Sequence, residues 1–170
     1  MMGRIPVGSA VSALLILMSL GAAGDELPAE IAAEGLSPFL KVHAEGAQIY
    51  ECKTDKDGHL SWQFREPIAS LFRDGRTVGR HYAGPTWEVG SSIVVGKVVA
   101  HAPGATPQDI PWLKLEVSDS LGNEDGPLED VTTIQRVYTK GGNLEGSCDK
   151  AGELHAEPYS ADYIFLEKPQ

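Results

Sequence analysis

The residues best suited to chemistry lie close together in residues 78–96. This stretch reads V-G-R-H-Y-A-G-P-T-W-E-V-G-S-S-I-V-V-G and holds His81, Tyr82, Trp87 and Glu88 among glycines and a proline. His81 and Glu88 are candidates for a general acid and base beside an aromatic platform, as in sites where carboxylates flank a sugar. Alternatively, Trp87 belongs to the core, Glu88 faces solvent, and His81 binds a backbone carbonyl. The stretch is therefore either a preformed site or a buried turn.

Arg136 is a further candidate for ligand binding. It lies in a β-branched run with Thr133 and Gln135, where its guanidinium would be able to clamp a carboxylate of a ligand. The alternative is an ion pair across the sheet with Asp162 or Glu51, because a buried arginine generally needs a partner. The predicted ligand-binding residues are thus His81, Tyr82, Trp87, Glu88 and Arg136.

Other kinds of catalytic or metal site find little support in the sequence. No two of the five histidines have the short spacing of metal ligands, so we predict no metal site. There is no G-x-S-x-G nucleophile elbow, and no G-x-G-x-x-G follows a predicted strand, so we also predict no dinucleotide or other cofactor. The five histidines are His43, His59, His81, His101 and His155.

The start of the chain predicts export. Arg4 precedes a short apolar run at residues 11–20, and the small residues Gly21-Ala22-Ala23 suit a cleavage site. We predict that residues 1–23 are a signal peptide, cut near Ala23 and Gly24, and that residues 24–170 form one secreted or periplasmic domain with no membrane span. The net charge of −10 makes the protein acidic and disfavours binding to nucleic acid.

The two cysteines, Cys52 and Cys148, both fall in the predicted exported part. An even number of cysteines in an oxidising compartment predicts one disulfide, which would close a loop of nearly a hundred residues. Free thiols or a metal pair are the alternatives, but the C-x-x-C spacing typical of metal sites is missing.

The rest of the chain predicts the strands that must position the candidate residues. Beyond residue 47 the apolar pattern has a period of two, and turn residues such as Asp57-Gly58 separate the runs. Predicted strands cover residues 48–52, 60–64, 77–82, 86–89, 93–101, 112–117, 131–140 and 159–166. Residues 27–40 predict a short N-terminal helical lead-in, and residues 67–72 an apolar bridge with one helical turn. This spacing predicts a single all-β domain, an antiparallel β-sandwich or barrel.

Several motifs in this order resemble a known family. They include Gln48-Ile-Tyr-Glu-Cys52, Val78-Gly-x-His-Tyr-x-Gly-Pro-Thr-Trp-Glu88, Ile110-Pro-Trp-Leu113, Thr133-Ile-Gln-Arg-Val137, Cys148-Asp149 and Pro158-Tyr-x-Ala-Asp-Tyr163. Together they resemble the secreted proteins grouped as domain of unknown function family 3455. The resemblance implies a secreted all-β domain without an established activity. Some fungal relatives carry a malate dehydrogenase label, which the missing dinucleotide motif does not support. Relatives usually carry Asp-Gly-Ser where this chain has Val89-Gly90-Ser91.

Three functions remain open from the sequence. The leading hypothesis is non-catalytic binding of a small molecule or glycan outside the cell or in the periplasm. The second is a secreted hydrolase or lyase that uses His81 and Glu88, and the third is a structural or interaction protein of the cell envelope. The sequence does not fix the ligand or the oligomeric state.

Overall fold

The computed structural model describes residues 27–122 and 125–169 of the chain. The predicted signal peptide, residues 1–23, lies outside the described residues. Within the described part, no helix is long and apolar enough to cross a membrane.

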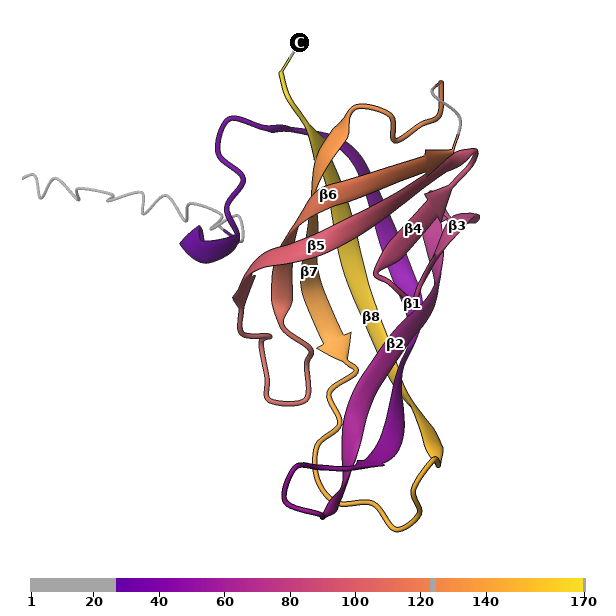
Figure 1. The fold of residues 1–170 in the computed structure, drawn as a ribbon. Helices are drawn as coiled ribbons and strands as arrows, with labels where there is room; N and C mark the ends of the chain where they lie inside the picture. The colour runs from indigo at the N-terminus through magenta and orange to yellow at the C-terminus, as the bar shows by residue number, and fades with distance from the viewer. Residues whose placement is uncertain (1–26, 123–124, 170) are drawn as a thin grey trace, which may run out of the picture.

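The described residues form eight strands in one antiparallel sheet (Figure 1). Each strand pairs with the next in the sequence, and β8 pairs with β1, which closes the sheet into a barrel. The predicted all-β antiparallel fold is confirmed. The strands are β1 (Ser37–Thr54), β2 (Leu60–Arg73), β3 (Arg76–Tyr82), β4 (Thr86–Val89), β5 (Ser92–Ala102), β6 (Trp112–Gly122), β7 (Val131–Gly141) and β8 (Leu154–Glu167).

Two local predictions are wrong. The helical lead-in at residues 27–40 is reduced to one turn of 3-10 helix, η1 (Ala29–Ile31), because Pro28, Gly35 and Pro38 interrupt any longer helix. The helical turn at residues 67–72 is also absent, since this segment continues β2. Pro67 is tolerated there because that part of β2 pairs with β1 alone, so no partner strand needs its missing N–H on the other side.

The core lies inside the barrel and follows the period of two along each strand. On β8 the side chains of Tyr159, Ala161, Tyr163 and Phe165 are all buried, as their alternation predicts. Burial of an apolar side chain of this kind contributes about 1.5 to 3 kcal/mol, so the alternating set on each strand fixes which face turns inward.

A second, smaller apolar cluster lies on the outer face of the sheet. Ile31 from η1 packs there with Ala102 of β5 and Val137 of β7. Two side chains of the sheet hold the backbone of this segment, because Gln135 Nε2 donates to the Ile31 carbonyl at 2.6 Å and Lys114 Nζ donates to the Ala32 carbonyl at 2.9 Å. The N-terminal segment is therefore a strap across β5, β6 and β7.

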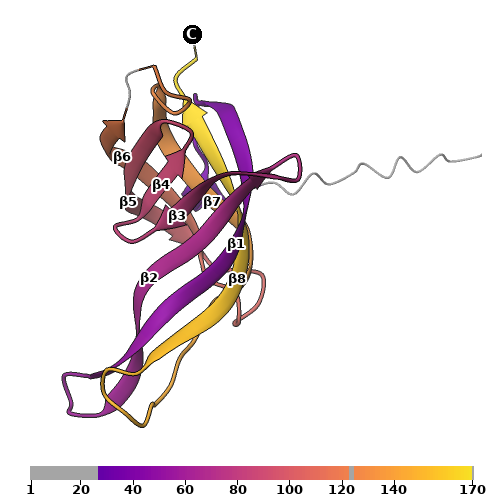
Figure 2. The ribbon, with the colours of Figure 1, turned by 90° about the vertical axis from the view of Figure 1, so that its right-hand side faces the viewer.

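The sheet is uneven at one end. β2 pairs with β3 only from Ala69 to Arg73, whereas its first nine residues, Leu60–Ile68, pair with β1 and have no ladder to β3. As a result β1, β2 and β8 extend together beyond the rest of the barrel (Figure 2).

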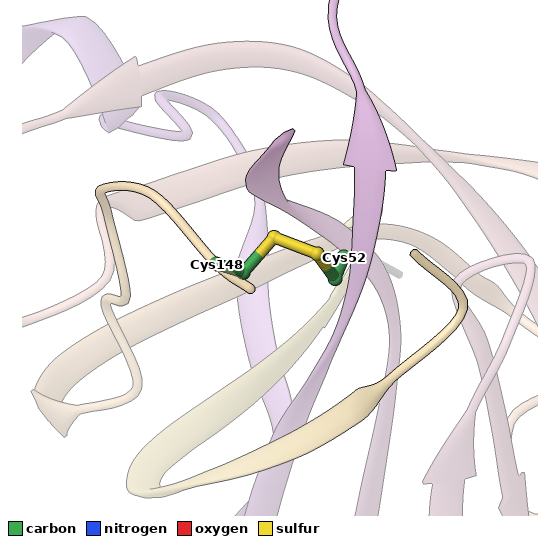
Figure 3. The surroundings of a disulfide bond; sticks show 2 residues. All are labelled: Cys52 and Cys148. Carbon is green, nitrogen blue, oxygen red and sulfur yellow. A yellow bond between two sulfur atoms is a disulfide. The ribbon is translucent and has the colours of Figure 1, made fainter. Parts of the chain in front are cut away.

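The predicted disulfide between Cys52 and Cys148 is present (Figure 3). It joins the end of β1 to the loop that connects β7 and β8, and the two Cα atoms are 5.9 Å apart. Backbone hydrogen bonds support the same junction, since the N–H of Cys52 donates to Glu153 and the N–H of Gly152 donates to Cys52. The long loop is thereby fixed along the extended end of β1 and β2.

Candidate functional site

Four of the five residues predicted to form the site lie on the hairpin of β3 and β4, and the fifth, Arg136, lies on β7. The register places His81 directly opposite Trp87, and Arg80 directly opposite Glu88. Neighbouring residues of a strand point to opposite faces, so His81 and Trp87 turn into the barrel while Arg80 and Glu88 turn outward.

His81 is held among aromatic rings inside the barrel. It is 2 % exposed, stacks on Trp87 with ring centroids 4.4 Å apart, and meets the edge of Tyr163 at 5.0 Å. Its Nδ1 lies 2.8 Å from the carbonyl oxygen of Thr86. A carbonyl has no proton to give, so Nδ1 carries the proton and Nε2 is left with a lone pair. Burial lowers the pKa of His81 to about 3, and the ring is neutral at physiological pH.

The low pKa of His81 predicts a loss of stability in mild acid. Below about pH 6.5 the unfolded chain protonates this histidine while the folded chain does not, so folding weakens as the pH falls toward 3. We expect a cost of about 2 kcal/mol between pH 6.5 and pH 5. Urea denaturation at several pH values measures it. In His81→Asn, which lacks the titrating ring, the pH dependence over this window should be smaller, and equal slopes in both proteins would contradict the assignment.

Glu88 belongs to a polar cluster on the outer surface. Its Oε2 accepts hydrogen bonds from Nε and Nη2 of Arg80 at 2.9 and 2.7 Å, and the hydroxyl of Tyr82 lies 3.5 Å away. The guanidinium of Arg80 also lies over the ring of Tyr82, 5.0 Å from its centroid. The structure thus brings Tyr82 and Glu88 together, but on the face of the sheet opposite to His81 and Trp87.

A cavity of about 540 Å³ opens into the barrel beside His81. All eight strands contribute side chains to its lining, and most of these are apolar or uncharged. The charged ones are Arg65 from β2 and Arg136 from β7. The opening lies on the side where β2 has lost its pairing with β3, since Phe64, Arg65 and Pro67 line it. Its apolar lining includes Phe64, Trp87, Val98, Ile110, Leu113 and Leu115, and its polar lining includes Gln48, Tyr50, Arg65, His81, Arg136, Asn143 and Tyr163.

Arg136 faces this cavity and has no carboxylate partner among the described residues. Its Nε and Nη2 both donate to the carbonyl of Pro111, at 3.1 and 2.8 Å. The expected pairing with Asp162 or Glu51 is wrong. Asp162 binds Lys41 and His43 on the outer face, and Glu51 lies 3.1 Å from Lys53. The guanidinium is therefore positioned by a backbone carbonyl and keeps its charge uncompensated.

Most of the cavity residues were missing from the sequence-based set, among them Gln48, Tyr50 and Asn143. Gln48 is 2 % exposed, and its Nε2 has no hydrogen-bond partner among the described residues. The hydroxyl of Tyr50 donates to Gly142 at 2.8 Å and thereby fixes the loop that carries Asn143. The alternating pattern of β1 could have indicated Gln48 and Tyr50. These residues lie four and two positions before Cys52 and therefore point to the same buried face of the strand.

The described residues contain no group of three or more histidine, cysteine, aspartate or glutamate side chains arranged to hold a metal ion. The polar groups of the cavity are instead hydrogen-bond donors and neutral rings, which suit the binding of an organic molecule.

Comparison with known proteins gives a family. The model of the family described as Protein of unknown function (DUF3455) matches residues 32–167. The chain belongs to this family. No curated protein and no solved structure matches the chain significantly. In this DUF3455 protein the matched region contains all eight described strands and every residue that lines the cavity. The cavity is therefore built entirely from the part of the chain that the family model describes.

Proposed function

We propose that this DUF3455 protein is a non-catalytic binding protein that holds a small, largely apolar molecule inside its barrel. The supporting observation is the open cavity of about 540 Å³ with a mainly apolar lining. Its volume falls within the range of small-molecule sites, roughly 300 to 1,000 Å³. Closed eight-stranded antiparallel barrels have an interior wide enough for one small ligand.

We place this activity outside the cell or in the periplasm. The disulfide between Cys52 and Cys148 supports that location, because disulfides persist in oxidising compartments. The signal peptide predicted for residues 1–23 is in agreement with it.

Binding suits the geometry better than the alternative of a hydrolase or lyase. An acid and base pair must reach the same substrate, whereas His81 and Glu88 point to opposite faces of the sheet. Neutral His81 also has no proton on Nε2 to donate at physiological pH. An apolar ligand is favoured over a glycan because most side chains that line the cavity are apolar, including Phe64, Val98 and Leu113.

A bulky side chain at the mouth should block ligand entry without disturbing the fold. Val98 and Val99 are neighbours on β5 and are similarly exposed, at 46 % and 43 %. Of the two, Val98 lines the cavity and Val99 does not. We expect Val98→Trp to weaken binding of the neutral dye N-phenylnaphthylamine by about ten-fold or more, the effect of losing roughly 1.4 kcal/mol of contact. Val99→Trp is the matched control and should bind as the wild type does. Fluorescence titration of the dye measures both.

Two results would reject the proposed function. The first is an absence of saturable dye binding by the wild-type protein. The second is equal affinity in the wild type and in Val98→Trp, which would place the dye elsewhere on the surface.

A further inference from the structure

The charges of the cavity differ from those of the whole chain. The chain has 24 Asp and Glu against 14 Lys and Arg. Among the described residues that line the cavity, however, the charged ones are Arg65 and Arg136, and none is acidic. An acidic protein that lines its cavity with arginines alone creates a local attraction for anions.

The two arginines differ in what already binds them. Arg65 lies at the mouth, where its Nε is 3.1 Å from Glu66, so a local carboxylate balances its charge. Arg136 donates to the carbonyl of Pro111 and lies close to the hydroxyl of Tyr163, but no ion pair involves it among the described residues. Its guanidinium can donate further N–H groups in the planar geometry that matches a carboxylate. Arg136 is therefore the better anchor for an anionic group inside the cavity.

A second, independent group in the cavity wall also lacks an acceptor. Gln48 Nε2 is a buried donor with no partner among the described residues, and the Gln48 side chain lines the cavity. A buried donor without a partner is costly, so a site with unpaired donors is suited to a ligand that brings acceptor atoms. The lone pair on Nε2 of His81 would repel an anion. The His81 ring is stacked on Trp87. The cavity thus combines hydrogen-bond donors at Arg136 and Gln48 with apolar surface such as that of Trp87.

We propose that the ligand is an organic acid, with an apolar body beside Trp87 and a carboxylate bound by the guanidinium of Arg136. This inference rests on the proposed function, because it requires that the cavity binds a small molecule. It goes further by naming the chemical class of the ligand and the residue that recognises it. A charge-assisted hydrogen bond contributes enough to favour the acid over its neutral methyl ester by about ten- to hundred-fold.

Competition against N-phenylnaphthylamine tests the inference on the whole purified protein at neutral pH. The competitors are matched pairs of a carboxylic acid and its methyl ester with the same body, one pair with a straight alkyl chain and one with a fused aromatic ring. All are used below their micelle-forming concentrations. In the wild type, the acids should displace the dye at concentrations about ten- to hundred-fold lower than the esters. In Arg136→Gln this preference should vanish.

The ratio of acid to ester affinity is the deciding quantity, because a general loss of structure in Arg136→Gln would weaken both partners of a pair alike. Arg136→Lys, which keeps the charge, should retain part of the preference. Arg80→Gln is the matched control, since Arg80 lies on the outer face of the sheet beside Glu88 and does not line the cavity, and its preference should match that of the wild type. If acids and esters compete equally in the wild type, the inference is overturned while the binding function stands. A preference that persists in Arg136→Gln overturns the assignment to Arg136. Failure of the dye to bind the wild type overturns the proposed function itself.

Discussion

Replacing both cysteines by alanine, Cys52→Ala together with Cys148→Ala, should lower the free energy of unfolding by about 4 to 5 kcal/mol. The disulfide joins residues 96 positions apart, so it removes much of the conformational freedom of the unfolded chain. Alanine is the suitable replacement because Cys52 is fully buried, and a serine hydroxyl there would need a new partner. Chemical denaturation followed by far-ultraviolet circular dichroism measures the change.

Reduction of the wild-type protein is the natural control for this variant. With a thiol reductant, wild-type stability should fall to about that of the double variant, whereas the double variant should not respond. The backbone hydrogen bonds of Cys52 with Glu153 and Gly152 remain available in both cases, so the fold itself should persist. A loss below about 1 kcal/mol would mean that these contacts, and not the covalent link, restrict the loop.

Trp87→Ala should cost about 3 to 5 kcal/mol, the range for deleting a large buried aromatic side chain. Trp87 is stacked on His81 and meets the edges of Tyr163 and Phe165, with centroids 5.3 and 6.5 Å away. It also lies so close to β5 that a Cβ on Gly96 would be 2.9 Å from its Cζ3. Removal of the indole therefore leaves a space next to the cavity that its neighbours on three strands cannot readily fill.

Trp62→Ala provides the comparison for this variant. Trp62 is half-buried on β2 and makes a tilted contact with His155 at 5.6 Å, so its deletion should cost clearly less. Trp87→Phe retains a ring in the barrel and keeps the experiment informative if the alanine variant does not fold. Equal losses for Trp62→Ala and Trp87→Ala in urea denaturation would show that Trp87 is not a central packing residue.

Much of the fold could be predicted because its signals are local. The turn at Asp57-Gly58 and the alternation on both sides of it specify the hairpin of β1 and β2, and Gly58 adopts the positive φ of 86° expected there. The boundaries of β4 were also predicted, as it is bounded by Gly84-Pro85 and Gly90. The helical prediction at residues 67–72 failed because pairing in the sheet outweighs weak local preferences, and the one at residues 27–40 failed because Pro28, Gly35 and Pro38 limit the helix to one turn.

The cavity was harder to predict because it depends on closure of the sheet. Gln48 on β1, Arg136 on β7 and Asn143 in the following loop meet only through pairings between distant parts of the chain. The separation of His81 from Glu88, in contrast, follows from the hairpin. A turn at residues 83–85 puts His81 opposite Trp87, so Glu88 must take the other face.

The uneven end of the barrel has a consequence for self-association. Closure gives most strands a partner on both sides, but the first half of β2 keeps an unpaired side, and an unpaired strand can recruit another chain into a continuous sheet. The tip of this half is covered, because Trp62 donates to Gly146 and Cys148 donates to Leu60. Beyond the tip come Arg65, Glu66 and Pro67, two charged residues and a proline without an N–H. The strand that lines the cavity thus carries charged residues and a proline that disfavour pairing with another chain.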